Sequence, residues 1–469
     1  MGRGEQTDEV DCAARETSEN SRGATGGAVR RKAISGAGLA YGLTRPSILV
    51  LLCAGTVMHL GIAIAQAAAR RREWDFSHYY VAALAMRHGL NPYAIDLRPL
   101  GRQIGLKGIA RATDTPFFLF CFEPLTWFGP AAAFWIWAGI NAVALTLAMI
   151  LILRAAPRLD RRQVISLSAI ILLYPPLSNH IYFAQTQILI LLLAAVAMRA
   201  FEARRDRLAG LALAVAGLLK VFPLVIAGYF IVRRRWRALG WTIAGLVAGM
   251  AATMVAFGVE RNVSFIAGTY LTRSAGFLAR PANVALGSFV SRLFWYATGS
   301  VTMSPWLNWT RMSSVALAEL ALLGLTIYAT MPRAGAGRGD ASARGDRESR
   351  EFALWVVAAI MLSPTAWIHY LVLLILPFML IAACGWRSTT SARVLWLMVG
   401  SYAAISLSMA LAGSTRNFLT EHPILKAALD ECATLSLLLA FASAWFFVSD
   451  APKLDGTGAA RLADSTAAR

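Results

Sequence analysis

Charged residues are scarce in this chain. They make up 15% of its 469 residues, against roughly 25% in soluble domains. Hydrophobic residues reach 57%, and the mean hydropathy is +0.55. The composition excludes a soluble globular domain and predicts an all-α, polytopic integral membrane protein.

Paired cysteines are missing as well. The five cysteines have no regular spacing, and three of them lie within apolar runs: Cys12, Cys53, Cys121, Cys384 and Cys432. Such a set predicts neither a disulfide framework nor a zinc site. The sequence also lacks a Gly-rich nucleotide-binding loop and an Asp-x-Asp motif, so we expect no metal and no other cofactor. No repeat of fixed period is visible.

Acidic residues are outnumbered by basic ones, and the formal net charge is +19. In a soluble chain this excess would suggest nucleic acid binding. Here the basic residues cluster in short loops between apolar runs, where they set the orientation of a membrane protein. We therefore expect membrane lipid, and no nucleic acid, among the partners.

The arginines predict the topology. Basic residues precede the first long apolar run, Pro46 to Ala69, so its amino-terminal end is expected in the cytoplasm. The expected organisation is a disordered cytoplasmic tail without a signal peptide (1–45), a transmembrane domain (46–448) with an outer loop (70–115), a long outer segment (258–309) and a flexible cytoplasmic loop (333–350), and a second cytoplasmic tail (449–469). We expect roughly ten to thirteen crossings of the cell (inner) membrane.

Several apolar runs are interrupted. Pro116 to Phe128 is too short to cross a bilayer untilted, so it predicts a half-span or, alternatively, a tilted crossing. Val164 to Tyr174 ends at two prolines, and Leu208 to Val232 is interrupted by Lys220 and Pro223. Broken helices persist in a membrane only where protein or a polar cavity satisfies the freed backbone groups. The interruptions therefore predict a polar cavity.

Polar side chains gather on the outer side of this topology. Asp75 follows the first span at the membrane boundary, where a carboxylate is either an anchoring feature or a base held against a substrate from the membrane. The other candidates are Glu123, Gln185, Gln187, Asn283, Arg292, Trp367 and His369. Purely structural roles remain open for some of them: Glu123 could cap a short helix, and Gln185 or Gln187 could form a hydrogen bond between helices.

Lys220 is one of only five lysines beside forty arginines, yet it lies within an interrupted apolar run. It either extends its amine to the interface or binds a phosphate presented from the lipid, as a compact point charge does. His369 lies in the aromatic segment Trp367 to Tyr370 at the end of a span. It is either a second donor to that phosphate or a structural histidine.

Five ordered motifs resemble glycosyltransferase family 87, the polyprenyl-phosphate-mannose-dependent alpha-mannosyltransferases with the GT-C membrane fold. They are Asp75 to Tyr80 followed by Gly89 to Tyr93, then Phe122 to Leu125, Ala184 to Gln187, Gly217 to Pro223 and Ser363 to Tyr370. The last resembles the family's Ser-Pro-x-x-Trp-x-His-His signature. The resemblance extends over roughly residues 46 to 385.

The chain departs from the family pattern at four positions. Glu123 stands at the first proline of Tyr-Pro-Pro-Leu, Ala184 replaces a glycine, Gln187 replaces an asparagine, and Tyr370 replaces the second histidine. These changes leave donor or acceptor preference open. The aspartate, glutamine, lysine, tryptophan and histidine of the motifs remain, which favours retained catalysis.

The resemblance implies a GT-C-like bundle with short or broken helices around an outward-facing cavity. It implies transfer of a hexose, mannose in the family, from a polyprenyl-phosphate donor to a glycolipid or polysaccharide acceptor. Asp75 would be the general base of an inverting reaction, and Lys220 and His369 would stabilise the leaving phosphate. Tyr79, Tyr80 and Trp367 could stack on sugars.

Two other functions fit the same outer polar residues. In a secondary transporter, Asp75, Lys220 and His369 would be coupling or substrate-binding charges, but such proteins commonly show internal repeats and ionisable residues at the bilayer midplane. A ligase or flippase of envelope polysaccharide would handle lipid-linked oligosaccharides instead of a lipid-linked monosaccharide.

Overall fold

The computed structural model describes residues 42–71, 75–107, 111–270, 278, 280, 282–299, 303–332, 341–386, 390–414 and 423–450. Within these residues the secondary structure is helical, apart from one isolated bridge between Asn283 and Trp367. The predicted all-α class is thereby confirmed. The tails expected at 1–45 and 449–469 lie almost wholly outside the described residues.

Seven helical segments are long and apolar enough to cross a membrane in the described part of the chain. They are α3 (Pro46–Arg70), α7 (Pro130–Ala155), α13 (Trp236–Phe257), α17 (Pro305–Thr330), Ile368–Trp386, which joins η5 (Ile368–Leu374) to α19 (Ile375–Trp386), and most of α20 (Ala392–Ser414) and α22 (Pro423–Ser449). Proline occupies the first turn of α3, α7 and α17, where its missing N–H costs no helical hydrogen bond. These segments confirm a polytopic membrane protein.

The remaining helices are shorter, broken or, in the case of α18, too highly charged to be counted with the seven. The α8 helix (Arg161–Leu172) and α9 (Pro175–Phe183) pass the same test as a pair, with a bend of 56° between them. The others are α10 (Gln187–Glu202), α11 (Asp206–Leu219), η2 (Phe222–Ile226), α12 (Ala227–Val232) and α18 (Ala341–Met361). Ten or more crossings are reached only if segments from this group are counted with the seven long ones.

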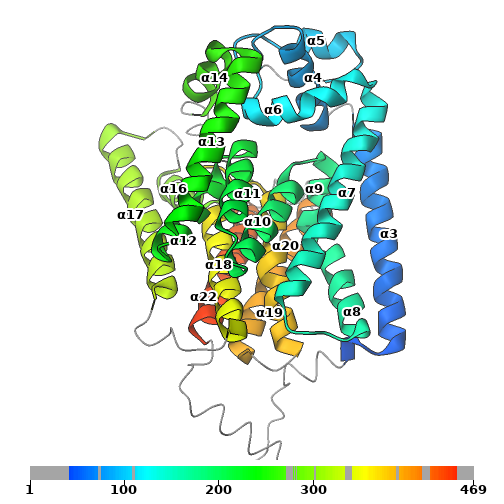
Figure 1. Cartoon of the computed structure of the whole chain (residues 1–469), viewed down its shortest axis with the longest axis vertical. Coiled ribbons are helices and arrows are strands. Elements are labelled where there is room, and N and C mark those ends of the chain that lie inside the picture. The colour runs from blue at the N-terminus through cyan, green and yellow to red at the C-terminus, as the bar shows by residue number, and fades with distance from the viewer. Residues whose placement is uncertain are drawn as a thin grey trace, which may run out of the picture.

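A group of short helices covers one end of the bundle, at the top of Figure 1. It comprises α4 (Asp75–Arg87), α5 (Arg98–Gln103), α6 (Pro116–Phe122), η1 (Glu123–Trp127) and α14 (Val259–Phe265), and we call it the cap. An aromatic cluster holds it together: the rings of Tyr79 and Phe118 lie 4.8 Å apart, and Phe122 packs 5.2 Å from Trp137 of α7. The expected half-span Pro116 to Phe128 is thus a helix and a 3-10 turn within the cap.

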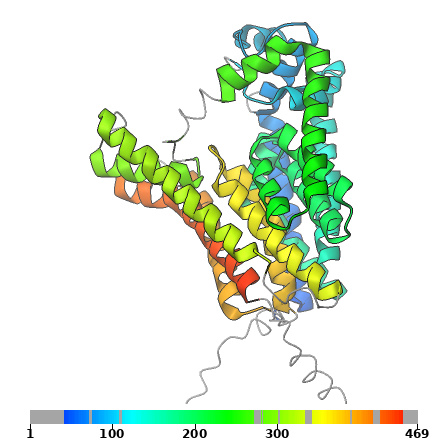
Figure 2. The ribbon, with the colours of Figure 1, turned by 60° about the vertical axis from the view of Figure 1, so that its left-hand side comes forward.

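The carboxyl-terminal helices diverge from the rest of the bundle in Figure 2, where α17 and α22 lie side by side. The α16 helix (Leu286–Thr298) packs beside them and carries the fully buried Arg292, whose guanidinium bonds to α22. Arg292 donates to Glu431 of α22 and to Thr434, and also to the backbone oxygen of Asn283. This pairing ties the segment before α16 to α22.

The expectation of a flexible loop over 333–350 is wrong for its second half. Residues 341–350 form the first turns of α18, and Glu348 is buried. The Gly/Arg/Asp-rich composition suggested solvent, but Arg204 pairs with Glu348 at 2.7 Å and Arg347 pairs with Glu351 at 2.8 Å. These polar side chains are paired within α18 and with the turn after α10, which stabilises a helix there. Residues 333–340 lie outside the described part.

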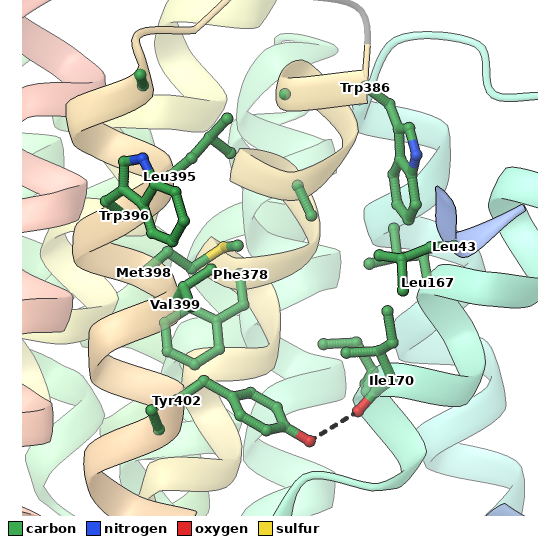
Figure 3. Close-up of a pocket in the computed structure, with 15 residues that line it drawn as sticks. Leu43, Leu167, Ile170, Phe378, Trp386, Leu395, Trp396, Met398, Val399 and Tyr402 are labelled. Carbon is green, nitrogen blue, oxygen red and sulfur yellow. Dashed lines mark hydrogen bonds between the residues drawn. The ribbon is translucent and has the colours of Figure 1, made fainter. Parts of the chain in front are cut away.

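An apolar pocket of about 270 Å³ lies among Leu43, α8, α19 and α20 (Figure 3). The Tyr402 hydroxyl donates to the backbone oxygen of Ile170 at its edge, at 3.1 Å. None of the residues that line it is charged. The pocket therefore offers no charged group to a phosphate.

Candidate active site

A larger, polar cavity of about 710 Å³ lies where the cap meets the helix breaks of the bundle. Its polar and charged lining residues are Asp75, His78, Tyr79, Thr113, Asp114, Thr115, Asn179, Gln185, Lys220, Arg280, Ser363, Thr365, His369 and Tyr370. Trp367 and Phe183 add aromatic surface. Several of these side chains, including Gln185, Lys220 and Trp367, come from residues at helix breaks.

The first break positions Gln185. The α9 helix ends at Ala184, which has the left-handed φ of 53°, and the Trp137 indole donates to its backbone oxygen at 2.8 Å. A left-handed residue at a helix end is usually glycine, so the glycine of the family motif suits this position better than alanine. The turn directs the buried Gln185 into the cavity.

The second break positions Lys220. The α11 helix ends at Leu219, and Lys220 is extended, with φ −148° and ψ 139°. The Thr115 hydroxyl donates to the freed backbone oxygen of Leu218 at 2.5 Å, which satisfies the acceptor that the break exposes. The Lys220 amine donates to the Gln185 side chain at 3.3 Å and lies 4.7 Å from the centre of the Tyr370 ring.

The third break carries Trp367 and His369. The Asn283 side chain donates to the backbone oxygen of Pro364 and accepts from the backbone N–H of Ala366 at 2.8 Å. These bonds fix the segment that leads into η5. His369 is buried, and its Nε2 has no hydrogen-bond partner among the described residues. His369 therefore lines the cavity with one unpaired ring nitrogen.

Asp75 is joined to the second break through Gln185. The Gln185 amide nitrogen donates to Oδ2 of Asp75, while its oxygen accepts from the Tyr79 hydroxyl at 2.8 Å. Nδ1 of His78 lies 3.4 Å from Oδ1 of Asp75. Asp75 also begins α4, where a helix amino terminus favours a negative charge. These contacts fix the carboxylate of Asp75 at the cavity wall.

Asp114 is a second carboxylate in this wall, and it was not predicted as a site residue. It lies directly before Thr115, the N-cap of α6. Burial raises its pKa from 3.8 to about 6, the nearby Asp75 adds to the rise, and Lys220 opposes it. The N-cap and Pro116 signal only a helix start, and no local pattern indicates that the preceding carboxylate faces Lys220.

Six of the eleven predicted site residues line this cavity: Asp75, Tyr79, Gln185, Lys220, Trp367 and His369. The other five do not. The Tyr80 hydroxyl donates to the backbone oxygen of Phe128 at 2.7 Å, Glu123 lies in η1, and Gln187 is buried at the start of α10. Asn283 and Arg292 hold the backbone behind the cavity. Among the described residues no group of three or more His, Cys, Asp or Glu side chains could hold a metal ion.

The comparisons with known proteins give one match. The sequence model of glycosyltransferase family 87 matches residues 113–345, just under half of the chain. The match supports a member of glycosyltransferase family 87. No curated protein and no solved structure matches significantly. Together with the seven apolar helices, the family match indicates a membrane glycosyltransferase, with a sugar donor and an acceptor.

The family 87 match includes Asp114, Gln185 and Lys220. It begins after Asp75 and ends before His369. The structure brings the two groups together, because Gln185 contacts both Asp75 and Lys220. The cavity therefore combines residues from the matched region with residues from both flanking regions.

Proposed function

We propose that this protein transfers a hexose, mannose by family resemblance, from a polyprenyl-phosphate donor to a glycolipid or polysaccharide acceptor. The observation that carries the proposal is the Gln185 side chain, which links Asp75 of the cap to Lys220 at a helix break in one cavity. A base for the acceptor and a cation for the donor are thereby held side by side.

The reaction would be an inverting displacement. The acceptor hydroxyl attacks the anomeric carbon while its proton passes to the Asp75 carboxylate. The bond between that carbon and the phosphate oxygen breaks, and its electron pair leaves on the polyprenyl phosphate. Lys220 and His369 line the same cavity and would stabilise the growing charge. Trp367 offers a ring for sugar stacking.

A lipid-linked donor suits the position of the cavity. Lys220 follows α11, which packs against the candidate spanning helix α13. When the donor phosphate reaches Lys220 from the bilayer, the polyprenyl chain stays among lipids and apolar helices. The chain is therefore not transferred into water. A lysine binds such a phosphate as a point charge.

The cavity is proposed to open to the outer face of the cell membrane. Exposed arginines lie in the turns at the end of the bundle away from the cap, among them Arg205 before α11 and Arg234 before α13. Short loops rich in arginine remain in the cytoplasm. The cap and its cavity would then face outward.

A donor assay with purified protein in liposomes tests this function. Labelled polyprenyl-phosphate mannose and a nucleotide-linked mannose are offered in parallel with a mixed glycolipid acceptor, and products are identified by mass spectrometry. We expect a mannosylated product from the lipid donor alone. Uptake of solute by the liposomes without any transfer from either donor would favour the transporter and overturn the proposal.

A further inference from the structure

Hydrogen bonds of the backbone of Asp114 and of the residues on either side of it fix this segment at the cavity. The Tyr93 hydroxyl donates to the Asp114 backbone oxygen at 2.8 Å, and the N–H of Ala112 donates to Pro92 at 2.9 Å. On the other side, Thr115 bonds to the end of α11. The short segment 112–115 is therefore clamped between the outer part of the cap and the break that carries Lys220.

The Asp114 carboxylate differs from that of Asp75 in what it contacts. Gln185 and His78 already engage Asp75. No side chain in the described part of the chain donates a hydrogen bond to Asp114 or pairs with it within 4 Å, although it lines the cavity. Its oxygens are thus open to a molecule in the cavity.

The charges around the cavity indicate which of the two substrates would contact Asp114. Asp75, His78 and Asp114 gather on the cap side, and Lys220, His369 and Arg280 lie on other lining segments. An anionic donor phosphate is repelled by two carboxylates and attracted by the cations. A neutral sugar with several hydroxyls has the opposite fit, because an ionised carboxylate accepts hydrogen bonds through both oxygens.

We propose that Asp114 binds the acceptor sugar by accepting hydrogen bonds from hydroxyls next to the one that Asp75 deprotonates. This inference rests on the proposed function. It makes Asp114 a specificity-determining residue for a neutral polyhydroxyl acceptor, and it leaves proton transfer to Asp75. A site built around a substrate hydroxyl discriminates strongly against analogues that lack it.

Acceptor binding by Asp114 should depend on pH. Asp114 must be ionised to accept two hydrogen bonds, so acceptor binding should weaken as the pH falls through about 6, the pKa that burial gives this carboxyl. The titratable and charged groups facing it are Asp75, His78 and Tyr79 from α4, Tyr93 from the cap, and Lys220 after α11. Both tyrosine pKa values are raised by burial, so neither phenol titrates in this range.

The test compares Asp114→Asn with wild type, and with Asp96→Asn as a control carboxylate of the cap that is exposed and paired with Arg98. We expect the acceptor KM of Asp114→Asn to rise roughly 10- to 100-fold, as for loss of a hydrogen bond to a charged group. Its donor KM should stay within about twofold, because Lys220 is retained. The increase of acceptor KM below pH 6 should disappear in this variant. Asp96→Asn should match wild type throughout.

Deoxy acceptors provide a measurement on the unaltered protein. We expect one deoxy position to raise the acceptor KM of wild type and to remove its dependence on pH near 6. An unchanged acceptor KM in Asp114→Asn, a rise in donor KM instead, or pH dependence that persists with every deoxy acceptor would overturn the inference while leaving the proposed function intact. Absence of transfer by wild type would instead overturn the proposed function.

Discussion

Gln185 donates a hydrogen bond from its side-chain amide to the carboxylate of Asp75, a residue 110 positions earlier in the chain. The same side chain accepts from Tyr79 and Lys220. Its two ends therefore differ in role, since the nitrogen orients the carboxylate and the oxygen holds the lysine. A side-chain amide can both donate and accept a hydrogen bond, whereas an ionised carboxylate of the same length can only accept.

Gln185→Leu should slow transfer without removing either charged partner. The leucine keeps much of the volume but removes the bond to Asp75 and leaves the buried Tyr79 hydroxyl without its acceptor, and such an unpaired buried group costs about 1 to 3 kcal/mol. We expect a lower kcat and a lower melting temperature in detergent. Gln103→Leu, at an exposed position of α5, should change neither. Wild-type turnover in Gln185→Leu would contradict the orienting role.

Lys220→Met and His369→Ala should act on the same phosphate. Loss of one charge-stabilising donor typically costs roughly 10²- to 10³-fold in rate, and we expect kcat and donor affinity to fall in both variants. A double-mutant cycle should show coupling of about 0.5 to 3 kcal/mol, because two groups that serve one ligand are not independent. Lys107→Met is the matched control, an exposed lysine outside the cavity. Additive losses would leave Lys220 with an interfacial role only.

Sidedness can be measured with introduced cysteines in a cysteine-free background. His88 is exposed at the end of α4, and Arg205 is exposed in the turn before α11. In intact cells, an impermeant thiol reagent should label His88→Cys at once and Arg205→Cys only after permeabilisation. The reverse pattern would place the cavity in the cytoplasm.

Asp114→Asn should also stabilise the protein at neutral pH. Because the folded pKa of Asp114 is raised from 3.8 to about 6, the folded state binds a proton that the unfolded state lacks between those values, and stability falls as the pH rises through that window. The variant does not carry this penalty, so it should be more stable by about 1 to 3 kcal/mol at pH 7.5. The difference should vanish near pH 4. Thermal melts at both pH values measure it, and an equal melting temperature at pH 7.5 would contradict the burial of an ionised Asp114.

The helix breaks could be predicted from the sequence because their causes are local. Proline at Pro175 and Pro223, with polar residues beside them, marks where α9 and η2 begin. Helix α4 of the cap was not predicted, because its stability comes from aromatic contacts between segments far apart in sequence, such as Phe76 with Phe134.

The site could be predicted where the residue type is unusual for its surroundings, as with Asp75 and Lys220. Polar residues alone do not reveal which way they face. Arg292 and Asn283 have the composition of ligand-binding residues, yet they satisfy backbone oxygens and Glu431. Asp114 was missed for the converse reason, because an aspartate in a loop is ordinarily solvated.

The most direct measurement is the rate of transfer by Asp75→Asn from a purified polyprenyl-phosphate sugar donor, compared with wild type and Asp96→Asn in the same liposomes. Asparagine keeps the shape and can still accept the bond from Gln185, so the fold should persist, which a thermal melt verifies. Because an amide cannot take the proton, we expect the rate to fall by about 10²- to 10⁴-fold, with donor KM nearly unchanged. An Asp75→Asn enzyme that turns over like wild type would contradict the assignment of Asp75 as the base.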